Sequence, residues 1–505
     1  MSAADMMSLL PLVILAAGSI LVLLMAAFLH RLLPAFLLTA GVTTAALVFA
    51  CISWADAPFT VGALLSFDRF VLFGVVLILA ATLFVSVSSW SSLRGRPGEG
   101  GDYFFLLLVA SLGACILAAS SAFASFFLGL ELLSVSLYAM IGWRREQGIG
   151  TEAAIKYLIL AGASSAFLLF GMALFYAATG SMDLFRLVDG GAGAGIAAPI
   201  GLGIMLVAVG FKLAVVPFHM WTPDVYDGAP APVTGYIASV SKGAMVIVLA
   251  RAFLPALAGS GASAAASAAA AATASAAQGP LSGAFPWVLA FIAGLSMFGG
   301  NILALRESNV KRILACSSIA HLGYLLVAFL AAGTEGLRAI AFYLVAYFVS
   351  TLGAFAVIGE LPTKERDAST VDDYKGLAAT RPGMAGVFTA MIFSLAGLPL
   401  TAGFIGKFLI LRAGASAELW VLAVMLAVNS TISIFYYLRI VSSMFRGFTA
   451  SAPSGAAGAA ARAVGTRAPL AAALALAALS LAVVALGVYP SPLLSFIGSF
   501  TGAAP

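Results

Sequence analysis

Residues 210–244 read GFKLAVVPFHMWTPDVYDGAPAPVTGYIASVSKGA, a largely apolar stretch with a lysine near each end. Pro217 has no amide hydrogen, so the carbonyl of Leu213, next to Lys212, loses its helical hydrogen-bond donor. The second lysine, Lys242, lies inside the next apolar segment. Irregular backbone at membrane depth survives only where it is buried in protein or lines water. The stretch therefore predicts a broken membrane helix beside a polar interior path.

The composition of the chain places this stretch in a lipid bilayer. Of the 505 residues, 62% are hydrophobic and 9% are charged, whereas an ordinary soluble domain is about 25% charged. This composition excludes a soluble globular protein and a disordered chain. The net charge of +5 comes from 25 Lys and Arg against 20 Asp and Glu. These basic residues are too few to form a nucleic-acid-binding stripe.

Fourteen segments of the chain are apolar over the about 20 residues that a membrane helix needs. They predict an all-α integral membrane protein with about fourteen transmembrane helices. Residues before position 9 include no Lys or Arg, so the first segment does not resemble a signal peptide. The fourteen segments are 9–29, 33–54, 67–93, 103–120, 122–142, 153–178, 195–216, 232–254, 283–306, 312–330, 336–361, 384–412, 417–446 and 468–490.

The Lys and Arg residues between these segments orient the chain, because short cytoplasmic loops contain an excess of them. If both termini are outside, fifteen cations lie in inside loops and five lie in outside loops or at helix ends, which supports an even number of spans. The inside set is Arg31, Arg94, Arg96, Arg144, Arg145, Arg306, Lys311, Arg312, Lys364, Arg366, Lys375, Arg381, Arg446, Arg462 and Arg467; the outside set is Arg69, Arg186, Arg251, Arg338 and Arg412.

The composition also divides the chain into parts. Residues 256–282 and 449–467 are rich in Ala, Ser and Gly, and we expect a poorly ordered insertion and an inside loop respectively. The charged stretch 362–382 predicts another inside loop. The predicted parts are spans one to three (1–102), spans four to eight (103–255), a linker (256–282), spans nine to thirteen (283–448), and an inside loop with a last helix (449–505).

Once the cations of the loops and helix ends are assigned, five basic residues remain within the predicted membrane segments, and Glu131 is the clear membrane acid; the five are Lys156, Lys212, Lys242, Lys407 and Arg439. A charge at the bilayer centre costs about 2.5–3.5 kcal/mol on insertion scales, so each needs a partner or a hydrated path. The alternative for the cations is that they extend to the interface, and it is stronger for Lys156 and Arg439 than for the others. Glu131 could instead be a structural carboxylate paired with one lysine. Ser134 and Tyr138 share its helix face.

A second broken helix resembles the first. Residues 393–410 read FSLAGLPLTAGFIGKFLI, in which Pro399 precedes Lys407 by eight positions. The two broken segments are the seventh and twelfth spans, so they cross the membrane in opposite directions. This arrangement is typical of inverted repeats, here spans four to eight against nine to thirteen. The repeat matches the span of Glu131 with the span of His321, and the span of Lys242 with that of Asn429.

These groups predict a line of proton carriers across the membrane interior. An ion pair at about 4 Å and an effective dielectric near 20 is worth about 4 kcal/mol. Opening or closing a Glu131–Lys212 pair could therefore switch a neighbouring lysine between its charged and neutral forms. Lys242, His321 and Lys407 would pass protons through water. The alternative for His321 is an ordinary core histidine with satisfied hydrogen bonds.

The sequence contains no motif that would supply energy within this chain. The cysteines, Cys51, Cys115 and Cys316, are isolated, and neither they nor the three histidines have metal-ligand or iron–sulfur spacing. No phosphate loop and no dinucleotide fingerprint is present. Transport would have to be driven by an ion gradient or by a partner.

Residues 210–244 resemble the signature of the antiporter-like membrane subunits of respiratory complex I, the NADH–quinone oxidoreductase. PDVYDGAP (223–230), APV (231–233) and SK (241–242) are most similar to the subunit N branch of that family. Three further segments agree: AAIKYLILAGASS (153–165), DDYKGLAATRP (372–382) and FSLAGLPLTAGFIGKF (393–408). The resemblance extends over essentially the whole chain.

The resemblance implies a proton-translocating subunit of a membrane arm. It implies that Glu131 and Lys212 form the ion pair, that Lys242 is the central relay, that Lys407 is a terminal proton site, and that Lys156 matches a family lysine. It implies no cofactor in this chain, with NADH, FMN, iron–sulfur clusters and quinone in partner subunits. The neighbours would be antiporter-like subunit M and small subunits K and J, in a bacterial inner membrane.

Two positions depart from the family pattern: Leu400 replaces an expected proline, and Leu12 an expected acid. Two other functions remain open on the residues alone. One is a subunit of a multi-subunit Na⁺/H⁺ antiporter or of a membrane-bound hydrogenase, which share the fold. The other is a purely structural subunit that holds a membrane arm together.

Overall fold

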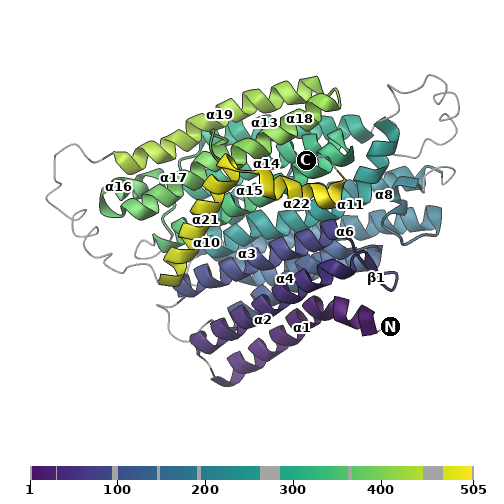
Figure 1. Cartoon of the computed structure of the whole chain (residues 1–505), viewed down its shortest axis with the longest axis horizontal. Coiled ribbons are helices and arrows are strands. Elements are labelled where there is room, and N and C mark those ends of the chain that lie inside the picture. Colours follow the sequence, from purple (N-terminus) through teal and green to yellow (C-terminus); the bar gives the residue numbers. More distant parts are fainter. Residues whose placement is uncertain are drawn as a thin grey trace.

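The computed structural model describes residues 3–29, 31–93, 100–144, 148–189, 195–261, 285–361, 367–446 and 470–502, which form a bundle of long helices (Figure 1). Several predicted features lie outside these residues. They are most of the linker 256–282, the loop 449–467, and the inside-loop cations Arg94, Arg96, Arg145, Lys364, Arg366, Arg462 and Arg467.

Within the described residues, twelve helices are long and apolar enough to cross a membrane, and each coincides with a predicted span. They are α1 (Ala3–Leu29), α2 (Leu32–Ile52), α3 (Arg69–Leu93), α4 (Gly101–Ala119), α5 (Phe123–Ile141), α6 (Gly148–Thr179), the unit α10–α11, α13 (Phe285–Arg306), α14 (Val310–Ala331), α15 (Gly333–Glu360), α19 (Trp420–Phe445) and α21 (Leu470–Val488). The unit α10–α11 consists of α10 (Ala231–Tyr236), a π-helical turn η2 (Ile237–Ser241) and α11 (Lys242–Gly261).

The two remaining predicted spans are both interrupted, as the prolines in the sequence indicate. One consists of α8 (Ala197–Leu213) and α9 (Trp221–Gly228), and the other of α17 (Pro382–Ala396) and α18 (Ala402–Ser416). The predicted all-α membrane architecture with two broken helices is therefore confirmed.

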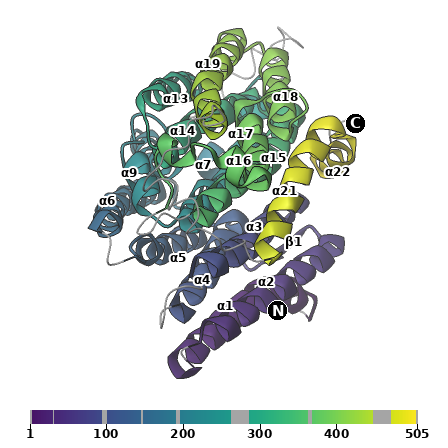
Figure 2. The same ribbon diagram turned by 90° about the vertical axis from the view of Figure 1, so that its left-hand side faces the viewer.

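The helices are arranged largely in sequence order across the bundle. The helices α1 and α2 pack on each other at one edge, against α3 and α4, and the α13–α19 region forms the opposite edge (Figures 1 and 2). The C-terminal α21 crosses this order, because it packs on α15, α17, α18 and α3. It thereby connects three helices of the second predicted repeat to α3, which precedes the first repeat.

The core is formed by three elements: the unit α10–α11, α14 and α15. In each of them, 89% of the most apolar window is buried inside the protein, which is the surface pattern of a helix surrounded by other helices. Two of these elements contain the predicted site residues Lys242 and His321. Two of the most enclosed helices of the bundle thus contain titratable side chains.

A β-hairpin between α2 and α3 was not predicted. The strands β1 (Phe59–Val61) and β2 (Leu65–Phe67) pair antiparallel around Gly62, whose φ of +57° suits glycine. The rings of Phe59 and Phe67 stack at 4.9 Å. The remaining short elements are η1 (Ser53–Asp56), α7 (Arg186–Asp189), η3 (Val371–Tyr374), α16 (Leu377–Thr380) and α22 (Ser491–Thr501).

Candidate functional site

The break after α8 presents Lys212 to the interior of the first half. Ala214 adopts a left-handed conformation (φ +59°), and the amide of Val215 and the indole of Trp221 donate to the carbonyls of Gly210 and Phe211. The last turn of α8 is thereby capped without a continuing helix. The Lys212 ammonium, in that last turn, is buried.

The partners of Lys212 are hydroxyls from two neighbouring helices. Its Nζ donates to Ser134 Oγ on α5 at 2.8 Å and to Tyr157 Oη on α6 at 3.1 Å. It also lies 5.7 Å from the centre of the Tyr157 ring, within the range of a cation–π contact. Lys212 is thus held by neutral groups.

The predicted direct ion pair between Glu131 and Lys212 is wrong for this structure. The Glu131 carboxylate is half-buried and accepts a hydrogen bond from the Ser165 hydroxyl on α6. Ser134, one turn after Glu131 on α5, occupies the position next to the Lys212 ammonium instead. The Ser134 hydroxyl itself donates to the Leu130 carbonyl at 2.7 Å, so Glu131 and Lys212 each bind a different serine.

Lys242 follows the π-helical turn η2 and is 1% exposed. Its Nζ donates to Ser318 Oγ on α14 at 2.7 Å and lies 5.5 Å from the centre of the Tyr226 ring. Ser318 in turn shares a 2.7 Å hydrogen bond with the hydroxyl of Tyr347 on α15. Lys242 therefore joins the first half of the chain to two helices of the second half.

Lys407 reaches back to the break between α17 and α18. Its Nζ donates to the carbonyl of Ala396, the last residue of α17, at 2.8 Å and to Ser430 Oγ at 3.1 Å. A cation is favoured there, because helix C-termini expose carbonyls with partial negative charge. Gly397 makes the contact possible: its φ is +79°, and a Cβ there would lie 2.8 Å from Lys407 Cδ.

His321 lies on α14 among four tyrosines. Its Nδ1 is 2.5 Å from the hydroxyl of Tyr343, and its Nε2 is 3.3 Å from that of Tyr437. The rings of Tyr324 and Tyr347 lie 5.5 and 5.3 Å from the imidazole. Tyr324 also lies 5.2 Å beneath the ammonium of Lys407. Hydroxyl and ring contacts thus extend from Lys242 past His321 to Lys407.

Two of the predicted membrane cations are not part of this interior line. Lys156 is 43% exposed and forms ion pairs with Glu152 at 2.7 Å and Asp224 at 2.8 Å. Arg439 donates to the carbonyls of Leu305 and Glu307 at the end of α13. The long side chains of both residues reach polar partners near helix ends, as the interface alternative requires.

The sequence did not predict a buried ion-pair cluster between the two halves. Asp367 pairs with Arg144 at 2.6 Å and with Lys311 at 3.3 Å, and it accepts the amide hydrogen of Ala231 at the start of α10. All three charged side chains are nearly inaccessible. Arg144 and Lys311 were expected in solvated inside loops, but burial is possible because one carboxylate serves both.

The tyrosine and serine partners were also missed, although their spacing gives a signal. Ser317, Ser318, His321 and Tyr324 follow a helical spacing on α14, and Tyr343 and Tyr347 are four residues apart on α15. Positions three or four apart share a helix face. A polar face on an otherwise apolar span would have identified them.

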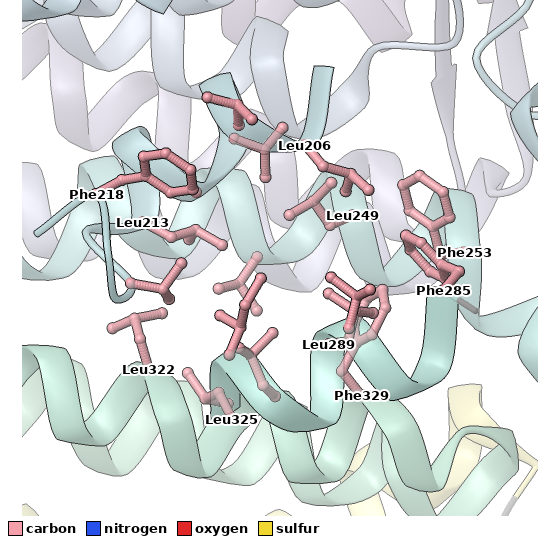
Figure 3. Close-up of a pocket in the computed structure, with 18 of the residues that line it drawn as sticks. Leu206, Leu213, Phe218, Leu249, Phe253, Phe285, Leu289, Leu322, Leu325 and Phe329 are labelled. Atoms are coloured by element: carbon pink, nitrogen blue, oxygen red, sulfur yellow. The ribbon is translucent and has the colours of Figure 1, made fainter. Parts of the chain in front are cut away.

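An apolar cavity of about 420 Å³ lies beside the line of polar groups, between α8, α11, α13 and α14. Figure 3 shows Leu213, Phe218 and Leu322 at one end and Phe253, Phe285 and Phe329 at the other. Leu213 and Leu322 are the sequence neighbours of Lys212 and His321. An apolar lining offers no hydrogen bonds to water, so a proton path has to follow the hydroxyl-lined side.

None of the ion pairs among the described residues includes Lys212, Lys242 or Lys407. The same part of the chain brings together no group of three or more His, Cys, Asp and Glu side chains that could hold a metal ion. The amines, the imidazole and the hydroxyls of this interior can exchange protons.

Comparison with known proteins gives a consistent relationship. The model of the family described as NADH:quinone oxidoreductase/Mrp antiporter, TM, matches residues 120–284 and 260–433. The chain is 40% identical to NADH-quinone oxidoreductase subunit N of Ectopseudomonas mendocina over 455 residues, 88% of this chain and 87% of that one. It is equally similar to subunit N of Methylococcus capsulatus over 500 residues, 96% of this chain and 93% of that one.

Solved structures agree on the fold. A chain of respiratory complex I from Thermus thermophilus with bound aureothin superposes with a TM-score of 0.77 at 32% identity, over 96% of this chain and 98% of that chain. Chains of an archaeal membrane-bound sulfane sulfur reductase and of the Mrp complex from a Dietzia species reach 0.83 and 0.81, each over 99% of this chain and 97% of the other. At 22% and 21% identity, these two likenesses concern the fold alone.

Proposed function

This chain belongs to the NADH:quinone oxidoreductase/Mrp antiporter family, among the N subunits of NADH-quinone oxidoreductase, and from that membership we propose that it carries protons across a membrane. Lys212, Lys242, His321 and Lys407 would be the carriers, and Glu131 would control the charge of Lys212. The energy would come from quinone reduction elsewhere in the complex. NADH, FMN, iron–sulfur clusters and quinone would be bound by partner subunits.

The observation that carries the proposal is the set of three buried lysines with neutral partners. Each ammonium binds a serine hydroxyl, and none has a carboxylate within ion-pair distance among the described side chains. A lysine paired with a carboxylate is held in its charged form, whereas an unpaired one at membrane depth loses less when it gives up its proton. Three such groups in one interior favour proton exchange over a purely structural role.

The partly exposed ion pairs of Lys156, Asp224 and Arg312 would have a separate role, at the surface end of the proton path. Lys156 and Arg312 both contact Asp224, at 2.8 Å each, and all three side chains are partly exposed. This rim lies beside α9, directly after the broken α8. We propose that protons enter or leave the interior past Lys156 and Asp224.

The membrane, the neighbouring subunits and the two repeats are part of the same proposal. The chain would lie in a bacterial inner membrane with both termini on the periplasmic side, next to subunit M and the small subunits K and J. Residues 103–255 and 283–448 would act as two inverted repeats around the buried lysines. The 40% identity to N subunits favours this setting over a Na⁺/H⁺ antiporter, to which the likeness is one of fold.

Lys242→Ala in the intact complex tests the proposal, with protons pumped per electron transferred as the measurement. We expect assembled complex with a lowered ratio, because the central amine is gone. Lys375→Ala is the matched control, since Lys375 is 53% exposed and its one ion pair among the described residues is with Asp372. An assembled Lys242→Ala complex that pumps at the wild-type ratio would overturn the proposal.

A further inference from the structure

His321 contacts a tyrosine hydroxyl at each of its ring nitrogens. Tyr343 approaches Nδ1 from α15, and Tyr437 approaches Nε2 from α19. All three side chains are buried. A neutral imidazole donates a hydrogen from one nitrogen and accepts one at the other. The two tyrosines therefore have different roles, and the remaining contacts of their hydroxyls indicate which role belongs to which.

Within the described part of the chain, the Tyr437 hydroxyl has a partner besides His321, whereas the Tyr343 hydroxyl has none. The Tyr437 hydroxyl also shares a hydrogen bond with Ser317 on α14. Among the side chains and backbone that the structure describes, the Tyr343 hydroxyl bonds to Nδ1 alone. A buried hydroxyl whose hydrogen finds no acceptor costs about 1–3 kcal/mol. Tyr343 therefore donates to Nδ1, which leaves the imidazole hydrogen on Nε2, directed at the oxygen of Tyr437.

We propose that these two tyrosines give the proton step at His321 a direction, from Tyr343 towards Ser317. Tyr343 is a positioning residue that makes Nδ1 the acceptor. Tyr437 is the hydroxyl that receives the hydrogen of Nε2 and passes its own hydrogen to Ser317. The inference rests on the proton-carrying function proposed above and adds the order of the groups around His321.

The transfer balances without any further reactant. A proton binds the Tyr343 oxygen as that tyrosine gives its hydrogen to Nδ1. The Nε2–H bond breaks as an O–H bond forms on Tyr437, whose former hydrogen moves to Ser317, and Ser317 releases a proton. Each group ends neutral. After the step the imidazole hydrogen is on Nδ1, so His321 must give up that hydrogen and bind another at Nε2 before Nδ1 can accept again.

Packing connects this step to the helix of Lys407. The Tyr343 ring lies against Gly406, the residue before Lys407, where a Cβ would be 2.9 Å from Tyr343 Cδ2. The absence of a side chain at Gly406 therefore allows Tyr343 to reach Nδ1. Any movement of α18 that displaces Lys407 also acts on the tyrosine that orients His321. The source end of the proposed step is thus the Lys407 side.

The test uses Tyr343→Phe and Tyr437→Phe in the intact complex, in membrane vesicles driven by NADH. We expect each variant to lower the proton-to-electron ratio by at least half. We also expect the solvent deuterium isotope effect on pumping to fall, because fewer hydrogens move together. Tyr236→Phe is the matched control: it also removes a fully buried hydroxyl, one bonded to Ser111 at 3.0 Å in the first half.

Gly406→Ala tests the same arrangement without removing a hydroxyl, and it too should lower the ratio by displacing the Tyr343 ring. If Tyr343→Phe and Tyr437→Phe behave like Tyr236→Phe in both measurements, while Lys242→Ala lowers the proton-to-electron ratio, the directed step is wrong and the proton-carrying function stands. If Lys242→Ala pumps normally, the proposed function itself fails, and the directed step fails with it.

Discussion

Glu131 and Lys212 lie on neighbouring helices without touching, because Ser134 stands beside the lysine and Ser165 binds the carboxylate. The Lys212 ammonium is held by a hydroxyl that lies one helical turn after Glu131 on the same helix. The Ser134 hydroxyl accepts from Lys212 and donates to the Leu130 carbonyl, next to Glu131 in the chain.

This relationship predicts coupling that depends on Ser134. Glu131→Gln and Lys212→Ala should each lower proton pumping, and the double variant should lower it less than the two losses added together, because both act on one switch. Introducing Ser134→Ala into all three should make the losses additive. The measurement is the proton-to-electron ratio in vesicles. Additive losses with Ser134 intact would contradict the coupling.

Gly397→Ala should disable the Lys407 site. The substitution puts a side chain on a left-handed backbone, which costs about 1–2 kcal/mol, and its Cβ would lie 2.8 Å from Lys407 Cδ. We expect a lower melting temperature and reduced pumping. Gly383→Ala, in the first turn of α17 with open space around it, is the control. Wild-type pumping by Gly397→Ala would show that Lys407 does not need its contact with Ala396.

Asp367→Asn should destabilise the subunit strongly, because it leaves Arg144 and Lys311 buried without a counterion. Removing one partner of a buried ion pair costs about 3–5 kcal/mol. We expect a lower melting temperature and less assembled complex. Asp372→Asn is the control, since the Asp372–Lys375 pair is exposed. Equal melting temperatures for the two variants would contradict the structural role of the Asp367 cluster.

The same carboxylate predicts how stability depends on pH. Burial raises the pKa of Asp367, but Lys311 and Arg144 lower it more, so its pKa lies below the ordinary value. A lowered pKa stabilises the fold above the unfolded pKa of about 4, and this contribution is lost as the pH falls through the folded value. The difference in melting temperature between wild type and Asp367→Asn should be constant from pH 8 to about 5. A difference that already shrinks between pH 8 and 6 would contradict this assignment.

Lys156→Ala should reduce pumping less than Lys242→Ala does, because Lys156 is partly exposed and Arg312 also holds Asp224. The remaining activity should vary with ionic strength, since salt screens exposed charges. The rate of NADH-driven proton uptake at low and high salt is the measurement. A loss as large as that of Lys242→Ala, at either salt concentration, would place Lys156 within the interior line instead.

The helices of this protein could be predicted from its sequence because a membrane helix requires a long apolar run. Pro217 and Pro399 located the breaks, since proline removes a helical hydrogen bond. The hairpin at Phe59–Phe67 was missed because three-residue strands leave too short a pattern between two apolar spans. Lys212, Lys242 and Lys407 were found for a different reason: a charge inside an apolar run is conspicuous.

The partners of these lysines could not be predicted in the same way. Ser318 and Tyr347 are ordinary residues in a membrane helix, and only the packing of α14 against α15 places them at Lys242. Arg144 and Lys311 were predicted in loops but are buried. Counting the charges that flank the membrane spans treats every such cation as solvated. Burial of an ion pair depends on a third segment, here Asp367, that no local pattern connects to them.

The Asp367 cluster lies at the first turn of α14, whereas the apolar cavity reaches Phe329 near the other end of that helix. The ion pairs of Asp367 join the two halves at one face, and the apolar cavity separates them towards the other face. Sliding of one half against the other is therefore resisted at the ion pairs and costs the least energy around the cavity. Relative movement of the two halves should thus be smallest at the ion pairs and largest along α8 and α13, which line the cavity.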